Sequence, residues 1–97
     1  MPTYVLLIDW TQQGVENFKD SVDRYETARD QFEGMGVRFR DIYWTLGSHD
    51  VVGIVDAPDS ETLAAALLRV ASQGSVRTTT LRALSADEMR EVIAKAG

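Results

Sequence analysis

The first part of the chain alternates between strand-like and helix-like spacing of its hydrophobic residues. The run from Tyr4 to Ile8 is apolar at every position, which predicts a strand buried on both faces. Thr11 is the expected N-cap of a helix, and Gly34 or Gly36 is its expected end. The apolar stripe of this helix steps by three, four, three and seven positions: Val15, Phe18, Val22, Tyr25 and Phe32.

A β-hairpin is predicted next, from two strand-like runs at 37–46 and 50–56. Glycine at the first position of a two-residue Gly47-Ser48 loop suits a type II′ turn, and Leu46 then opposes His49. With this register one face of the hairpin carries Ile42, Trp44, Leu46, Val51 and Val55. The other face carries Phe39, Tyr43, Val52 and Ile54, interleaved with Asp41, Thr45, Asp50 and Asp56.

The remaining residues predict a helix, a strand and a short terminal helix. Asp59 is the expected cap of the second helix, which Gly74 ends, and residues 75–84 are rich in β-branched side chains. Ser85 and Glu88 have the spacing of a capping box. The order β-α-β-β-α-β plus one helix indicates an α+β fold, a ferredoxin-like βαββαβ sandwich with an extra C-terminal helix.

Both faces of the predicted sheet are apolar, although the fold supplies helices for only one of them. Val5 and Leu7 point to one side of the first strand, and Leu6 and Ile8 point to the other. Leaving five or six large side chains in water would forgo roughly 1.5 to 3 kcal/mol each, and soluble monomers rarely expose so large a patch. We therefore expect a second copy to cover this face, in a homodimer or higher oligomer with a two-fold axis.

Composition narrows the classes of partner and site. Ninety-seven residues make a single domain, 1–97, and with a net charge of −5 and ten scattered Lys and Arg we expect neither nucleic acid nor membrane as a partner. The chain has no cysteine and one histidine, which excludes cysteine-based and multi-histidine metal sites within a protomer, so we expect no metal site. No cofactor is expected either, although His49 is also the natural candidate for a haem ligand. The start of the chain lacks signal-peptide features, and no apolar run approaches the ~20 residues that span a bilayer, which favours a cytoplasmic location.

Candidate functional residues gather around the hairpin. Histidine is the residue type most often used as a general base near neutral pH, so His49 and Asp50 are the candidate catalytic residues, although a solvated turn residue is the simpler interpretation of His49. Adjacent strand residues point to opposite faces, so Asp50 does not orient the His49 ring in a regular strand. A cleft on the uncovered sheet face is expected to bind a ligand through Tyr43, Thr45, Asp50, Arg77 and Thr79.

Two further choices underlie that ligand set. Arg77 and Arg82 are five positions apart and fall on opposite faces of their strand, so only Arg77 is assigned to the cleft. The alternative for either arginine is a salt bridge with an acidic residue. Among the aromatic residues that could stack on a ligand, Tyr43 is preferred, because Trp44 and Trp10 are expected to pack in the core or at a strand end.

Four segments carry a resemblance to a known family: PTYVLLIDWTQQG, KDS, YWTLGSHDVVGIVDAPD and GSVRTTTLRAL. Together they cover nearly the whole chain and resemble the GYD family, small bacterial proteins within the dimeric α/β-barrel superfamily. The family motif Gly-x-Tyr-Asp corresponds to Gly47-Ser48-His49-Asp50, so histidine stands at the tyrosine position and a role of that hydroxyl does not carry over. The resemblance implies a dimeric α/β barrel and implies no single chemistry.

Three functional hypotheses follow. The first is a homo-oligomer that binds a small aromatic or acidic metabolite on the uncovered sheet face. The second is a cofactor-independent enzyme, namely an isomerase, cyclase or monooxygenase, in which His49 or Asp50 moves a proton and Arg77 or Tyr43 stabilises an oxyanion. The third is a structural or partner-binding oligomer without a ligand.

Overall fold

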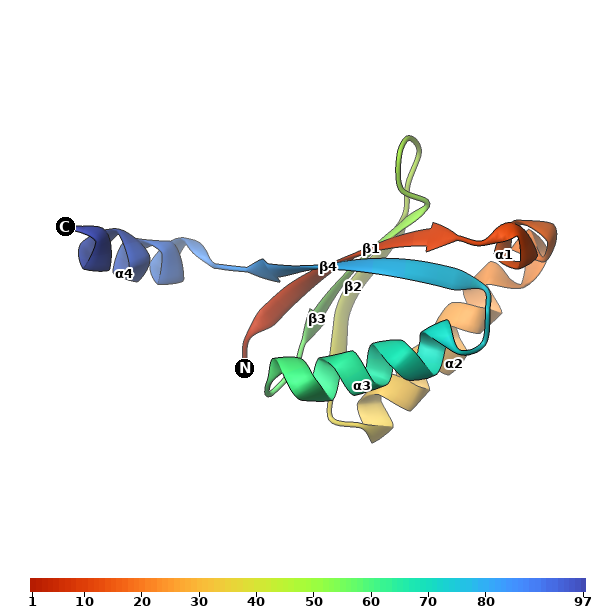
Figure 1. Ribbon diagram of the computed structural model, residues 1–97, viewed down its shortest axis with the longest axis horizontal. Helices are drawn as coiled ribbons and strands as arrows, with labels where there is room; N and C mark the ends of the chain where they lie inside the picture. The colour runs from red at the N-terminus through yellow and green to blue at the C-terminus, as the bar shows by residue number, and fades with distance from the viewer.

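The computed structural model describes all of residues 1–97, and its elements follow the predicted order with one helix divided. In chain order they are β1 (Thr3–Trp10), α1 (Gln12–Glu16), the 3-10 turn η1 (Phe18–Asp20), α2 (Ser21–Gly34), β2 (Arg38–Trp44), β3 (Val51–Asp56), α3 (Ser60–Ala71), β4 (Val76–Ala83) and α4 (Ala86–Ala96). The strands form one antiparallel sheet in the order β2-β3-β1-β4. Because α2 and α3 lie on the same side of this sheet (Figure 1), the predicted ferredoxin-like sandwich is confirmed.

The hydrophobic core lies between the sheet and these two helices. Leu6 of β1 and Val55 of β3 are almost wholly buried, and Phe32 of α2 and Leu63 of α3 cover them from the helical layer. Burying such a side chain contributes roughly 1.5 to 3 kcal/mol. The core therefore defines a helix face of the sheet, and the opposite side is called the open face below.

The predicted helix starts are confirmed. The Thr11 side chain accepts a hydrogen bond from the Gly14 N–H at the start of α1, and Asp59 accepts one from the Thr62 N–H at the start of α3. At the start of α4, Ser85 forms the predicted capping box with the residue three positions later. Each cap satisfies an N–H that has no partner within its own helix.

The prediction of one continuous first helix is wrong. The helix is interrupted at Asn17, and η1 separates α1 from α2. The Arg24 guanidinium donates a hydrogen bond to the Asn17 carbonyl oxygen at 2.6 Å. Because a 3-10 turn advances only about three residues per turn, the first members of the predicted stripe fall out of line with the later ones. Val15 and Phe18 are consequently 48 and 58% exposed, and Val22, in the first turn of α2, is 53% exposed.

The hairpin has the predicted register but shorter strands. Tyr43 lies opposite Val52 and Trp44 opposite Val51, which is the alignment expected from a Gly47-Ser48 tip. The ladder ends at that second pair, and residues 45–50 form a loop that protrudes beyond the sheet (Figure 1).

One side-chain assignment within the hairpin is wrong. The register passes from Phe39 opposite Val55 to Asp41 opposite Ile54, so β2 contains an extra residue at a bulge. A bulge shifts the alternation of side chains by one position. Phe39 therefore points to the helix face, where its ring lies 5.0 Å from that of Phe32, instead of sharing the open face with Tyr43.

Candidate functional site

The centre of the open face is apolar and has no cover. Pairing across the sheet aligns Leu7 with Val52 and Val5 with Ile54, and the flanking strands add Tyr43 and Leu81. Both α2 and α3 lie on the other side of the sheet (Figure 1). Tyr43 is 57% exposed and Leu81 is 47% exposed. This surface is therefore a candidate interface for a partner.

One end of the open face is polar. The His49 imidazole lies with Nδ1 3.1 Å from a carboxylate oxygen of Asp9, the last but one residue of β1. Arg77 of β4 pairs with Asp9 across the sheet. The loop is fixed by the Thr45 hydroxyl, which donates to the His49 carbonyl oxygen at 2.6 Å, and by the Asp50 carboxylate, which accepts from a backbone N–H of β1 at 2.9 Å.

The structure places Thr45, Asp50 and Arg77 at this end and Tyr43 and Thr79 nearer the apolar centre, so the five predicted site residues do not converge. Tyr43 and Thr79 both belong to the open face, but they lie on the two edge strands, roughly 14 Å apart at the usual strand spacing. The Thr45 and Asp50 side chains bond the backbone, and Arg77 is exposed. A ligand site that uses all five residues stays a prediction and would need a second molecule to enclose it.

The sequence did not point to Asp9, which contacts the His49 ring in the way that was considered for Asp50. Asp9 and His49 are 40 positions apart, and they meet because β1 pairs with β3 directly after the hairpin loop. A carboxylate on Nδ1 orients the imidazole and leaves Nε2 available for a proton transfer. Neither residue lines a cavity of the chain.

The other arginine of β4, Arg82, forms a salt bridge, which was the alternative role considered for it. Arg82 lies on the helix-face register with Tyr4, whose ring it covers at 5.7 Å, and pairs with Glu88 at 3.2 Å. The assignment of Arg77 and Arg82 to opposite faces is thus confirmed. Hydrogen bonds from the Ser85 N–H and from Arg82 lower the pKa of Glu88.

A small cavity of about 80 Å³ lies on the helix face, between the sheet and the two long helices. Its lining is mostly apolar and includes Trp10, Tyr25 and Trp44, with Ser21 and Arg24 as polar members. Trp44 donates from Nε1 to the Ser21 hydroxyl at 2.8 Å. The two tryptophans therefore meet at this cavity, whereas Tyr43, the preferred stacking residue, lies on the opposite face.

The structure meets neither the requirements of a metal site nor those of a membrane-spanning helix. No group of three or more His, Cys, Asp or Glu side chains is placed to hold a metal ion. No helix combines the length and the apolar character needed to cross a bilayer.

Comparisons with known proteins agree with this architecture. The chain is 39% identical over 85 residues to a Thermus thermophilus protein named as a glutamine synthetase and cystathionine beta-lyase binding protein, covering 87% of this chain and 90% of that one. A crystal structure of a protein from the same organism matches with a TM-score of 0.58 at 24% identity, over 89% of this chain and 96% of that one, which supports the fold. The GYD domain model matches residues 4–93, so the chain belongs to the GYD domain family.

Proposed function

We propose that this chain is a cytoplasmic homodimer that pairs through its open faces and binds a metabolic enzyme. The observation that carries the pairing is the uncovered apolar centre of the open face, which includes Val5, Leu7, Val52 and Ile54. Sheets stack about 10 Å apart, and a two-fold axis between two open faces would bury these side chains against their equivalents.

Two observations support an enzyme as the further partner. The Thermus relative, 39% identical, is named for binding glutamine synthetase and cystathionine beta-lyase. In the present chain, Leu46 is wholly exposed on the loop that protrudes beyond the sheet (Figure 1). An apolar side chain presented on a projecting loop is suited to fill a pocket of a larger protein.

The proposal is tested by sedimentation of the purified protein alone and mixed with each of the two enzymes from the same host. We expect a dimer alone and a larger complex with at least one enzyme. Leu46→Ser should weaken the complex by about tenfold, or 1.4 kcal/mol, and leave the dimer intact. Ser48→Ala, on the same loop, is the matched control. A monomer would refute pairing, and a dimer that binds neither enzyme would refute the partner.

A small ring compound in the helix-face cavity is the second candidate, favoured by the Trp10, Tyr25 and Trp44 side chains that line it. Its volume of about 80 Å³ is small beside the roughly 300 to 1,000 Å³ of most ligand sites, so protein binding is the better-supported function. Both tryptophans of the chain line the cavity. Titration with phenol, with excitation at a wavelength that phenol does not absorb, should therefore change tryptophan fluorescence, and a flat titration would exclude this site for such rings.

A further inference from the structure

The C-terminal helix α4 extends away from the body of its own chain. It continues from the end of β4 and makes only marginal contact with the other elements (Figure 1). The radius of gyration is 14.6 Å, against about 12.5 Å for a compact domain of this length. This projection leaves α4 uncovered, with an apolar face made of Met89, Val92 and Ile93 that Leu84 continues just before the helix. These side chains are 42 to 58% exposed.

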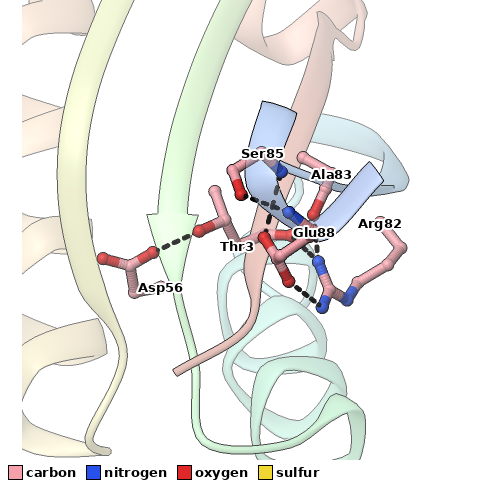
Figure 2. Close-up of polar contacts among 6 residues, drawn as sticks. All are labelled: Thr3, Asp56, Arg82, Ala83, Ser85 and Glu88. Atoms are coloured by element: carbon pink, nitrogen blue, oxygen red, sulfur yellow. Dashed lines mark hydrogen bonds and ion pairs between the residues drawn. The ribbon is translucent and has the colours of Figure 1, made fainter. Parts of the chain in front are cut away.

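The direction of α4 is fixed by polar contacts at its base. Figure 2 shows Arg82 donating to the carbonyl oxygens of Thr3 and Ala83 and to the Glu88 carboxylate. The same carboxylate accepts from the Ser85 N–H, while the Ser85 hydroxyl accepts from the Glu88 N–H. These bonds join β1, β4 and the first turn of α4, and they hold the helix outward.

A helix in this position needs a partner to be stable. It has 11 residues, and isolated helices shorter than about 12 to 15 residues are marginal in water. The capping box stabilises α4, but amphipathic helices gain most of their stability from burying the apolar face.

A second exposed apolar patch lies at the other end of the molecule. We call Val15, Phe18 and Val22 the N-terminal patch, and it lies on α1, η1 and α2, at the far end from α4 (Figure 1). Like the apolar face of α4, it consists of a few large side chains that are about half exposed.

We propose that α4 of each chain crosses to a second copy and packs its apolar face against the N-terminal patch of that copy. The inference rests on the homodimer proposed above, because a two-fold axis that exchanges the ends of the molecule covers both patches in both copies at once.

The size of the open face favours the same arrangement. Alternate positions of strands of eight, seven, six and eight residues supply roughly 15 side chains, short of the 20 to 30 residues per partner in a standard interface. Adding α4 and the N-terminal patch brings the contact into that range. An unrelated partner on α4 would leave the N-terminal patch of both copies uncovered.

Cross-linking between two single-cysteine proteins tests the contact, because the natural chain has no cysteine. We expect a mixture of Phe18→Cys and Ile93→Cys proteins, treated with a short bismaleimide, to give a covalent dimer joined between positions 18 and 93. Replacing the second protein by Ala94→Cys, on the opposite side of α4, should reduce that product at least severalfold. Equal yields from the two mixtures, or no product from the first, would overturn the proposal.

Sedimentation equilibrium separates this inference from the pairing of the open faces. The double variant Val92→Asp, Ile93→Asp should weaken the dimer by about tenfold or more, while the matched control Ala94→Asp should have little effect. A wild-type dimer that the double variant does not weaken would refute the α4 contact and leave sheet pairing standing. A wild-type monomer would refute both. Loss of enzyme binding with an unchanged dimer would assign α4 to the enzyme and also refute the proposal.

Discussion

Adjacent leucines of β1 give a direct test of which sheet face is covered and by what. Leu6 is 1% exposed on the helix face, whereas Leu7 is only partly buried on the open face. Leu6→Ala removes a fully buried side chain from the core and should lower the free energy of unfolding by about 3 kcal/mol, within the range of 2 to 5 for such changes. In an isolated chain, Leu7→Ala should cost only about 1 kcal/mol, because part of its surface already contacts water.

The prediction differs if the open face forms a dimer interface. Urea unfolding would then depend on protein concentration, and a change of about a hundredfold would raise the apparent stability of the wild-type dimer by about 2.7 kcal/mol. Leu7→Ala should reduce this dependence by weakening association, whereas Leu6→Ala should lower stability equally at both concentrations.

Circular dichroism during unfolding at two concentrations provides the measurement, and the two variants act as controls for each other. The reasoning is refuted if wild-type stability is independent of concentration and Leu7→Ala costs about 1 kcal/mol at both. A cost for Leu6→Ala below that of Leu7→Ala would instead show that the core is assigned to the wrong face.

Three further predictions concern local structure. Gly14→Ala should destabilise the fold by about 1 to 3 kcal/mol in urea unfolding, because its Cβ would overlap the Ser75 carbonyl oxygen, whereas Gly34→Ala, which meets no neighbour, should not destabilise it. Asp50→Ala should cost about 1 kcal/mol in the same assay through loss of its bond to a β1 backbone N–H. Because the pKa of Glu88 is lowered from 4.5, its contribution to α4 should be complete above that pH and lost as pH falls through the depressed pKa. The protection factors of the α4 amides, which correct for the intrinsic pH dependence of exchange, should then fall in acid, and a Glu88→Gln variant that keeps the wild-type pH profile would contradict this.

The sequence by itself determined the features that depend on residues close together in the chain. Thr11, Asp59 and Ser85 were identified as helix caps because a cap bonds an N–H only two or three residues away. The hairpin register followed from the Gly47 turn and the alternation of its strands. The order of these elements was enough to select the ferredoxin-like fold, because few topologies accommodate it.

Tertiary structure alone decided how distant segments meet. The extra residue in β2 moved Phe39 to the helix face, and the break at Asn17 exposed the first half of a stripe that is regular in sequence. Asp9 meets His49 only because β1 pairs with β3, 40 positions along the chain. The spacing of hydrophobic residues indicates which side chains are to be buried. It does not indicate whether they are buried by the same chain or by a second copy, because burial depends on three-dimensional contacts rather than on neighbours in sequence.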